Sequence, residues 1–361
     1  GIVIQYREMA AQTERKISDT VLYHSASEKK TGDLYLGVIG AGQFARALLL
    51  PAFYSQKGVV FKKICTLSGV SAAAAAKKFK AFEATSSADS VFRDPQINAL
   101  LIATRHDSHA RYVMMGLENK MAVFVEKPLA TTLDDLDAIK SFFDDTNADG
   151  PFLMVGYNRR FSPLSKLLKE TLHKFREPIS IIYRVNAGFI PDKEWVHDEV
   201  SGGGRIIGEC CHFVDFLTFI IGASPAYVTA QAMKKNGKTV PDVVTITLEY
   251  PEGSLGTIHY FSNGHSALPK EYIEVFQGGV SAQLLNFREL HFHGIRSHGK
   301  TSYLNQVKGY KEEAESFITA LRDGQPPPIP FRDLYLTTKA TLLADLAIRS
   351  GESGRFKVDE S

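Results

Sequence analysis

Short apolar runs alternate with helix-like stretches through the first half of the chain. Each run has the length of a buried strand, and the stretches between the runs have apolar positions at helical spacing. The pattern predicts strands at 34–39, 59–64, 97–102 and 121–125 and helices at 44–54, 71–79, 109–119 and 133–143. This alternation is typical of a parallel sheet covered by helices.

The second half of the chain is richer in strands. After Gly150–Pro151 the pattern predicts strands at 179–185, 227–233, 243–250, 254–261 and 272–276. Turn residues such as Pro251–Gly253 separate consecutive strands, which indicates an antiparallel sheet built from adjacent hairpins. Because a large sheet with one uncovered face often becomes a subunit interface, we expect a homo-oligomer.

A last helix is predicted at 332–349, after the proline-rich segment 325–330. Its candidate apolar face consists of Leu334, Ala340, Leu342 and Leu346. The chain has 361 residues, which is more than one hydrophobic core usually organises. We therefore expect about two domains.

The composition argues against several classes of partner. A net charge of +2, with 44% hydrophobic and 23% charged residues, gives no broad attraction to nucleic acid or acidic membranes. No apolar segment approaches the ~20 residues that cross a bilayer, and the first thirty residues are too polar for a secretory signal. Cys65, Cys210 and Cys211 fit neither a disulfide framework nor a zinc site. We expect a cytoplasmic protein with no nucleic-acid or membrane partner.

Three histidines near the end of the strand-rich half raise the question of a metal. His291 and His293 alternate on one strand face, and His298 follows them. No carboxylate or cysteine falls at ligand spacing from these histidines, so we expect no metal site.

A glycine loop follows the first strand and opens the first helix. Gly40, Gly42 and Ala45 frame this loop, and Gln43 and Phe44 lie inside it. Glycines in such a place let the backbone approach a pyrophosphate, whose charge the helix N-terminus stabilises. The alternative is a tight strand-to-helix turn that binds no ligand.

A charged triplet strengthens the first interpretation. Glu126-Lys127-Pro128 ends the apolar run 121–125, about 80 residues after the glycine loop, a distance that one doubly wound sheet can span. Because this combination is harder to obtain by chance than a glycine loop alone, it indicates an enzyme that uses a nicotinamide dinucleotide.

The choice between NAD and NADP stays open. The segment Ile64–Ser68, at the end of the second strand, lacks the acid that usually binds the ribose of NAD, and Thr66 takes that position. Thr66 or Ser68 could hydrogen-bond a 2′-phosphate, but no arginine stands beside them.

Together these motifs and several others resemble the glucose-fructose oxidoreductase and inositol dehydrogenase family. The resemblance runs from about Asp33 to the end of the chain. Its motifs are Gly40–Ala45, Ala103-Thr104 with His109, Glu126–Pro128, Gly156–Phe161, and Gly202–Gly204 with His212 and Asp215.

The resemblance implies an α/β fold of two parts. An N-terminal Rossmann domain with a doubly wound parallel sheet is followed by a C-terminal α/β domain with a large, mostly antiparallel open sheet. The expected organisation is an extension or linker at 1–32, the dinucleotide-binding domain at 33–153, a substrate and oligomerisation domain at 154–330, and a C-terminal helix and tail at 331–361.

The resemblance also implies roles for individual residues. Lys127 would lie between the nicotinamide and the reacting hydroxyl, Pro128 would follow a cis peptide bond, and His212 would be the acid/base. Thr104, His109 and Glu126 would belong to the cofactor site. The roles suit the chemistry, because oxidising an alcohol requires a proton acceptor and a cation that favours the alkoxide. The alternatives are a solvated lysine at a strand end and a helix histidine with satisfied hydrogen bonds.

One position departs from the family pattern. The family usually places an aspartate four residues before the histidine, where this chain has Gly208. Glu209 lies at i−3 from His212 and could replace the aspartate as a catalytic residue. It could equally be an acid placed early in a helix to complement the dipole.

Several residues of the second half are candidates for binding substrate. Asn158, Arg159 and Arg160 follow what we take as the first strand of the second domain, and arginine presents a planar fork of donors. Salt bridges between the domains are an equal alternative for these arginines. Trp195 could stack on a sugar ring or could simply pack.

The start of the chain suggests a longer polypeptide. Residues 185–191, Trp195 and 203–212 resemble the C-terminal half of fused oxidoreductases whose N-terminal half is similar to a zinc-type alcohol dehydrogenase. An upstream domain of that kind is therefore a possible partner. Residues 1–32 also read as an expression remnant or a plain polar linker.

We expect an NAD(P)-dependent dehydrogenase or reductase acting on a secondary hydroxyl, or the matching ketone, of a carbohydrate-like substrate. Two alternatives stay open. Some relatives use tightly held NAD to oxidise a sugar transiently and then cleave a glycosidic bond. A non-catalytic sensor of dinucleotide or sugar is the other alternative, since an acid is missing at Gly208.

Overall fold

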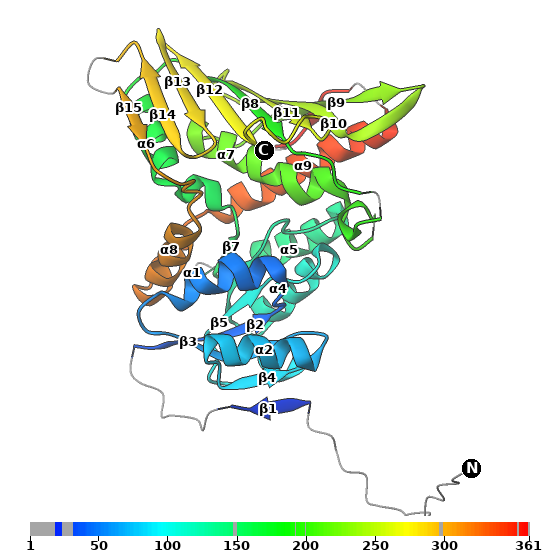
Figure 1. Cartoon of the computed structure of the whole chain (residues 1–361), viewed down its shortest axis with the longest axis vertical. Coiled ribbons are helices and arrows are strands. Elements are labelled where there is room, and N and C mark those ends of the chain that lie inside the picture. Colours follow the sequence, from blue (N-terminus) through cyan, green and yellow to red (C-terminus); the bar gives the residue numbers. More distant parts are fainter. Residues whose placement is uncertain are drawn as a thin grey trace, which may run out of the picture.

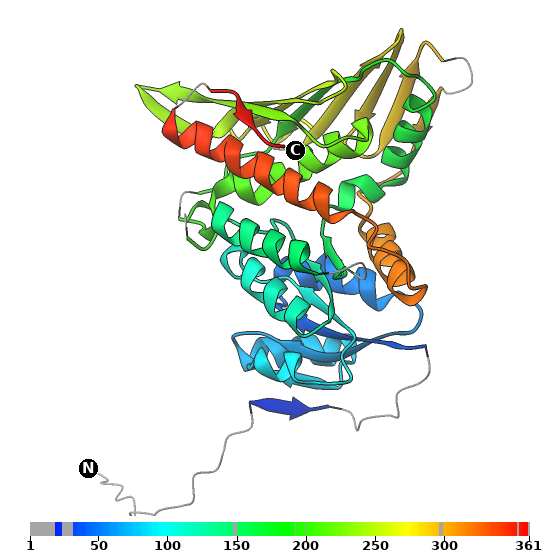
Figure 2. The same ribbon diagram turned by 180° about the vertical axis from the view of Figure 1, so that it is seen from behind.

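The computed structural model contains two sheets, one above the other, with helices between them and around the lower one (Figures 1 and 2). It describes residues 19–23, 32–146, 150–191, 193–198, 200–295, 299–351 and 354–359. The N-terminal half forms the lower part, and the upper sheet belongs to the C-terminal half (Figure 1).

The lower sheet has seven strands in the order β1-β4-β3-β2-β5-β6-β7. Its pairs are parallel except for β1 with β4. The central strands are buried on both faces, which explains their unbroken apolar sequences. The strands are β1 Thr20–Leu22, β2 Leu34–Ile39, β3 Val59–Cys65, β4 Glu83–Thr85, β5 Ala99–Ile102, β6 Ala122–Val125 and β7 Leu153–Val155.

Helices cover this lower sheet much as the sequence predicts. They are η1 Ala45–Leu49 (a π-helix), α1 Leu50–Tyr54, α2 Gly69–Phe79, α3 Asp89–Phe92, η2 His106–Ser108, α4 His109–Glu118 and α5 Leu133–Asp145. A clear local signal begins α5, because the Thr132 hydroxyl accepts a hydrogen bond of 3.1 Å from the Asp135 amide. Strands β1 and β4 and helix α3 were not predicted, since each has only three or four residues.

The strand β7 corrects one expectation. We took the strand before Asn158 as the first of the second domain, but β7 pairs in parallel with β6 in the lower sheet. The expected boundary between residues 153 and 154 falls inside this strand. Within the expected extension 1–32, β1 pairs with β4 at the edge of the same sheet.

The upper sheet has nine strands in the order β15-β14-β13-β12-β8-β11-β10-β9-β16. It is mostly antiparallel, as expected, but the expectation of adjacent hairpins throughout is wrong. Strand β8 lies between β11, its parallel neighbour, and β12, its antiparallel neighbour. The strands are β8 Ser180–Asn186, β9 Tyr227–Lys235, β10 Lys238–Glu249, β11 Leu255–Phe261, β12 Glu271–Gln277, β13 Val280–Leu285, β14 Glu289–His293, β15 Lys300–Ser302 and β16 Phe356–Lys357.

Helices cover one face of the upper sheet, with α7 and α9 running between this sheet and the lower part (Figures 1 and 2). The rings of Phe213 and Phe216 on α7 contact Tyr183 of β8 at 4.9 and 5.3 Å between centroids. The helices of this half of the chain, including α8 beside the lower part, are η3 Asn158–Phe161, α6 Pro163–Leu172, η4 Trp195–His197, η5 Ile206–Cys210 (a π-helix), α7 Cys211–Ile221, α8 Tyr310–Arg322 and α9 Phe331–Ser350.

The C-terminal helices tie the two parts together. Phe317 of α8 packs against Phe53 and Phe124 in the core of the lower part. The helix predicted at 332–349 is α9, in which Leu334, Ala340 and Leu342 are buried as expected. The inclusion of Leu346 in that face is wrong, because its side chain is 46% exposed.

Candidate active site

The glycine loop lies at the carboxyl end of β2, where a parallel sheet offers a binding crevice. Gly40 has φ of +92°, and a Cβ there would lie 2.4 Å from the Ala103 carbonyl oxygen, so only glycine fits. A Cβ on Gly42 would meet nothing within 4 Å. The backbone thus turns closely on one side and leaves room on the other, which fits a bound pyrophosphate. Phe44, at the start of η1, is partly exposed.

Two further loops at this edge carry predicted cofactor residues. Thr66 follows β3, and its hydroxyl donates a hydrogen bond of 2.6 Å to the Ser68 carbonyl oxygen, which shapes the turn into α2. The hydroxyl of Thr104, after β5, lies 2.6 Å from that of Ser108. The loop after β3 supplies no arginine that would bind a 2′-phosphate, and Arg105 of the loop after β5 lies over the ring of Trp195.

His109 is fully buried beneath these loops. Its Nδ1 lies 2.7 Å from the Pro128 carbonyl oxygen, and its Nε2 lies 3.2 Å from that of Thr104. Burial lowers the pKa of His109, so at neutral pH the uncharged ring can donate only one of these hydrogen bonds. His109 therefore joins the loop after β5 to the loop after β6.

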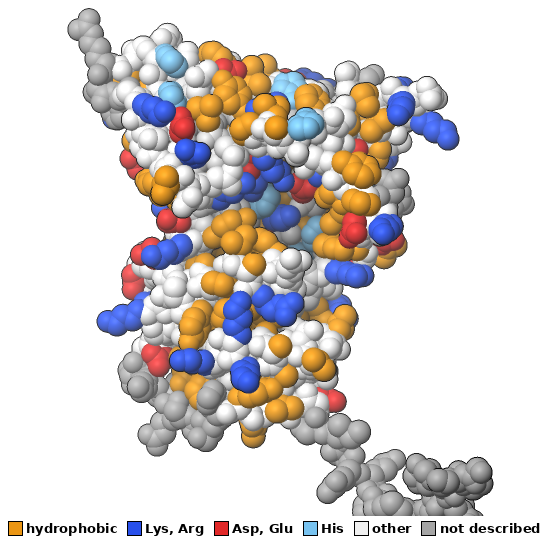
Figure 3. Space-filling view, viewed as in Figure 1, with side chains coloured by type: hydrophobic (Ala, Val, Ile, Leu, Met, Phe, Trp, Pro, Cys, Tyr) orange, Lys and Arg blue, Asp and Glu red, His pale blue; other side chains and the backbone are white. Residues whose placement is uncertain are grey.

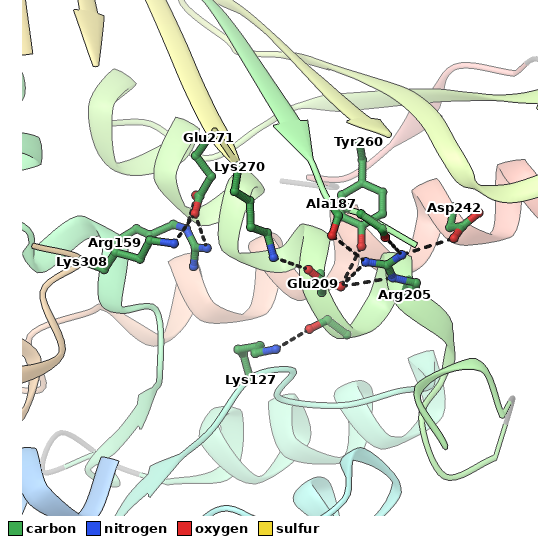
Figure 4. A network of polar contacts seen from close by, with 12 residues as sticks. Lys127, Arg159, Ala187, Arg205, Glu209, Asp242, Tyr260, Lys270, Glu271 and Lys308 are labelled. Carbon is green, nitrogen blue, oxygen red and sulfur yellow. Dashed lines mark hydrogen bonds and ion pairs between the residues drawn. The ribbon is translucent and has the colours of Figure 1, made fainter. Parts of the chain in front are cut away.

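The triplet Glu126-Lys127-Pro128 follows β6, and its two charged side chains lie in different surroundings. The peptide bond between Lys127 and Pro128 is cis, as the resemblance implies. Burial raises the pKa of Glu126 to about 7. The Glu126 carboxylate packs against Gly156, where a Cβ would lie only 3.1 Å from it. Lys127 points the other way, and its Nζ donates a hydrogen bond of 2.7 Å to the Gly208 carbonyl oxygen (Figure 4).

His212 lies in the first turn of α7, one helical turn beyond Gly208. Its Nδ1 is buried without a hydrogen-bond partner among the described residues, so it differs from a satisfied helix histidine. Burial, then the charges of Arg159 and Lys127, lower the pKa of His212 well below its usual value. The ring is therefore uncharged at neutral pH and able to accept a proton.

Glu209 accepts hydrogen bonds from three side chains. The donors are Arg205 Nη2 at 3.0 Å, the Tyr260 hydroxyl at 2.7 Å and Lys270 Nζ at 3.1 Å (Figure 4). Burial would raise the pKa of Glu209, but the positive charges of Lys270, Arg205 and Lys127 outweigh it and lower the pKa to about 2. This geometry favours a permanently ionised counter-ion over a group that exchanges protons.

Asn158 and the two arginines of η3 are engaged by the protein itself. Arg159 forms a two-pronged ion pair with Glu271, whose Oε1 also accepts from Lys308 Nζ at 2.7 Å (Figure 4). Asn158 Nδ2 donates to the Lys308 carbonyl oxygen at 2.8 Å.

Arg160 pairs in the same way with the buried Asp215 of α7. Both arginines thus pair with carboxylates of the strand-rich half of the chain, Glu271 of β12 and Asp215 of α7. Binding of substrate by Asn158 and Arg159 stays a prediction.

Trp195, in η4, packs against the loop that follows β5. Its ring lies 4.9 Å from that of His106, and the Arg105 guanidinium lies 5.8 Å from its centre. Trp195 is only half-buried. Its predicted stacking on a sugar therefore stays a prediction beside a clear packing role.

Four polar residues of this site were not predicted as site residues: His106, Arg205, Tyr260 and Lys270. A signal existed for His106, because it follows β5 at the same edge as the glycine loop. Tyr260 and Lys270 reach Glu209 only through the pairing of β8 with β11 and β12, which the local pattern does not reveal.

Neither the histidines of the upper sheet nor the cysteines form a metal site in the described parts of the chain. His291 contacts Glu289 at 3.2 Å, while His298 lies outside the described residues. No group of three or more potential metal ligands occurs among the residues that the structure describes. The three cysteines are buried and unpaired.

The described helices include none with the length and apolar character needed to cross a membrane. Viewed from the side shown in Figure 3, the molecule has a waist between its two parts, where Lys, Arg and His side chains gather in a hollow. The hollow thus has the character of a polar, partly positive site beside the edge of the lower sheet.

Two family models match the chain. Residues 34–157 match the model described as "Oxidoreductase family, NAD-binding Rossmann fold" of GFO/IDH/MocA, and residues 177–276 match the GFO/IDH/MocA C-terminal domain. Together they cover more than half of the chain. The first model spans β2 to β7 of the lower sheet, and the second spans strands of the upper sheet.

Several curated relatives match at low identity. Myo-inositol 2-dehydrogenase of Thermotoga maritima is 26% identical over 289 residues, which are 75% of this chain and 82% of the relative. Trans-1,2-dihydrobenzene-1,2-diol dehydrogenase of Mus musculus is 28% identical over 279 residues, which are 74% of this chain and 72% of the relative.

Solved structures share the fold. An oxidoreductase domain protein from Kribbella flavida superposes with a TM-score of 0.79 at 20% identity, over 91% of this chain and 100% of that one. Levoglucosan dehydrogenase in complex with NADH and levoglucosan superposes with a TM-score of 0.77 at 21% identity, with the same coverage. With both family models and the two-sheet architecture in agreement, the chain belongs to the GFO/IDH/MocA family and is an NAD(P)-dependent oxidoreductase.

Proposed function

We propose that this protein transfers hydride between NAD or NADP and a secondary hydroxyl, or the corresponding ketone, of a sugar, cyclitol or sugar nucleotide. One observation carries the proposal: Lys127, from the edge of the lower sheet, hydrogen-bonds to Gly208, one helical turn before His212. A cation and an uncharged imidazole thus approach the same place from the two parts. The names of the relatives, which include a myo-inositol and a levoglucosan dehydrogenase, support a polyol-like substrate.

In this proposal the carboxyl edge of the lower sheet holds the cofactor. The open side of the loop at Gly42 would receive the pyrophosphate, and Thr66 and Ser68 the adenosine ribose. A bound nicotinamide would accept or supply the hydride. The other proposed cofactor residues are Gly40, Gln43, Phe44, Ala45, Thr104, His109, Glu126, Lys127 and Pro128.

Side chains of the protein transfer the proton. The uncharged ring of His212 accepts the hydroxyl proton while the Lys127 ammonium stabilises the developing alkoxide. In the direction of reduction, the His212 ring would first take up a proton from solvent and then donate it to the alkoxide, while Lys127 polarises the carbonyl. Glu209 does not exchange the proton in this proposal; it holds Lys270 and Arg205 in place through ion pairs.

Two measurements test the proposal. Thermal shifts with NAD and NADP, each at a concentration far above its Kd, should raise Tm for at least one of the two nucleotides. NADH or NADPH formation is then followed with myo-inositol and levoglucosan as probes. Failure of both nucleotides to bind would remove the proposal.

The competing functions predict different results in the same assays. A tightly held cofactor, with cleavage of a glycoside and no net NADH, would indicate the glycoside-cleaving alternative. Binding of a nucleotide without turnover of any carbohydrate in a broad screen would indicate a sensor. That alternative is motivated by Gly208, where the resemblance leads one to expect an acid.

We also infer a homo-oligomer and a cytoplasmic location. The helices lie against one face of the upper sheet, and the other face carries partly exposed apolar side chains such as Ile182 and Phe276. Three unpaired, buried thiols suit a reducing compartment. A partner domain similar to an alcohol dehydrogenase, upstream in a longer polypeptide, remains part of the proposal.

A further inference from the structure

Position 208 has no side chain, and His106 fills the space that a side chain would take. A Cβ on Gly208 would lie 2.8 Å from His106 Cε1 and 3.3 Å from its Nδ1. The first distance is shorter than real Cβ contacts allow. Glycine at 208 and histidine at 106 are therefore mutually dependent, although 102 positions separate them in the sequence.

The His106 ring is held in this place on three sides. Its Nδ1 lies 2.8 Å from the Gly202 carbonyl oxygen. The rings of Trp195 and His109 lie against it, with centroids 4.9 and 5.7 Å away. A ring fixed in this way cannot move aside for a larger residue at 208 without losing these contacts.

The same contacts determine the protonation of His106. Because a carbonyl oxygen only accepts, Nδ1 carries the proton, and Nε2 of the uncharged ring is left as an acceptor. Burial, then the charges of Lys127 and His109, lower the pKa of His106 to about 3. Among the described residues none bonds to Nε2, and 9% of the residue surface is exposed.

His106 and Lys127 contact the same residue from different sides. Lys127 Nζ binds the backbone carbonyl of Gly208, while His106 occupies the volume beside its Cα. Glu209, the other candidate for the missing acid, already accepts from Arg205, Tyr260 and Lys270. The imidazole of His106 thus lies beside position 208 and keeps one ring nitrogen without a partner among the described residues.

We propose that His106 takes the place of the acid that is missing at position 208, and that its Nε2 accepts a hydrogen bond from a substrate hydroxyl beside Lys127. The proposal rests on the proposed function, since it names a substrate-binding residue of that site. An uncharged acceptor binds a hydroxyl without placing a second carboxylate beside Glu209, which already pairs with Arg205 and Lys270. The substrate class that fits is an uncharged polyol with a hydroxyl adjacent to the carbon that is oxidised.

A thermal cycle tests the place of His106 without any substrate. Gly208→Ala should lower Tm by about 2–4 °C, as overpacking does in a domain of this size. In the His106→Ala background the same change should be neutral or raise Tm, because the clash is gone and alanine favours the helix.

Gly116→Ala is the matched control for this cycle. Its Cβ would lie 2.7 Å from Val123 Cγ2 and 2.8 Å from Leu100 Cδ1, and His106 is not among its nearest contacts, so its cost should be the same in both backgrounds. An equal loss of Tm on Gly208→Ala with and without His106 would refute the packing of the His106 ring against Gly208.

Kinetics test the acceptor. With myo-inositol or levoglucosan, His106→Phe keeps the ring volume but should raise KM at least ten-fold and leave the Kd for NADH unchanged. The exchange variant His106→Ala/Gly208→Asp restores an acceptor in the vacated space and should recover most of the lost kcat/KM. A wild-type KM in His106→Phe, or an exchange variant no better than His106→Ala, would overturn the proposal.

The two proposals fail in different ways. If the wild-type protein binds NAD but oxidises no polyol, the proposed function and the acceptor role of His106 fail together. The thermal cycle still tests whether the His106 ring packs against Gly208. If the wild-type protein is active and only the His106 variants behave unexpectedly, the proposed function stands and the further inference fails.

Discussion

Lys127 Nζ donates a hydrogen bond of 2.7 Å to the carbonyl oxygen of Gly208, and this contact joins the edge of the parallel sheet to the π-helix before His212. A backbone carbonyl fixes the ammonium without neutralising its charge. Among the described residues, no carboxylate forms an ion pair with Lys127. Single π-helical turns occur often at functional sites, and this one presents its carbonyl to the lysine.

Lys127→Met should remove turnover without unfolding the protein. The variant loses the cation that stabilises the alkoxide, so we expect kcat to fall by about 10²–10³-fold or more. Circular dichroism and the Kd for NADH should stay close to wild type. Lys174→Met, at an exposed position beyond α6, is the control with unchanged kcat. Activity of the wild-type level in Lys127→Met would contradict the assignment.

His212 should set the pH dependence of oxidation at low pH only. Its pKa is lowered in the folded protein, so the ring stays uncharged, and competent as a base, well below pH 6.5. We expect kcat/KM for oxidation to show no loss near pH 6.5 and to decline only at more acidic pH. A clear inflection of kcat/KM at pH 6.5 that disappears in His212→Asn would contradict the lowered pKa of His212.

His212→Asn should lower kcat/KM by about 10²–10⁴-fold, the usual contribution of a general base. His293→Asn, on the exposed end of β14, is the matched control and should keep full activity. Equal rates for the two variants would remove His212 from the mechanism.

The pair of Arg159 and Glu271 should be a major source of stability. The Glu271 side chain is fully buried and accepts from both Arg159 and Lys308. Glu271→Gln leaves the buried Arg159 and the partly buried Lys308 without a counter-charge, so we expect the free energy of unfolding in urea to fall by about 3–5 kcal/mol. Asp89→Ala breaks the exposed pair with Arg93 and should cost at most about 1 kcal/mol. A similar small loss in both variants would contradict this reasoning.

These ion pairs show where the sequence stops being informative. The strand at 34–39 and the glycine loop behind it follow from local pattern, because a buried parallel strand and a tight turn each need particular residues. The partner of Arg159 does not, since Glu271 comes beside it only when β8 lies between β11 and β12. The position of His106 in the sequence placed it at the binding edge, but its contact with Gly208 could not be predicted, because 102 positions separate the two residues.

Glu209 should contribute to stability above about pH 4.5 and lose that contribution in acid. Its pKa falls from 4.5 to about 2 on folding, so the unfolded chain binds more protons between these values. Stability therefore decreases as pH falls through this window. Glu209→Gln should flatten the decline of Tm between about pH 4.5 and the lowest pH at which the protein stays folded. Glu315→Gln, exposed on α8, should leave the decline as in wild type.

The open face of the upper sheet should be buried between copies of the chain. Ile182 of β8 and Phe276 of β12 point away from the core, and their side chains are 39% and 43% exposed. The strands alternate in burial, so these residues share the face opposite α7. Isolated exposed apolar residues are ordinary, but a broad sheet face that no helix covers is typical of an interface.

Light scattering after size-exclusion chromatography should accordingly give a mass that is a multiple of 39.9 kDa. Ile182→Glu/Phe276→Glu places two charges on each copy of that face, and their desolvation on association should shift the mass to that of a monomer. Val70→Glu/Leu67→Glu carries the same charge change to exposed positions at the start of α2 and should leave the mass unchanged. A monomeric wild-type protein, or an oligomer that withstands both charges on β8 and β12, would mean that this face is not the interface.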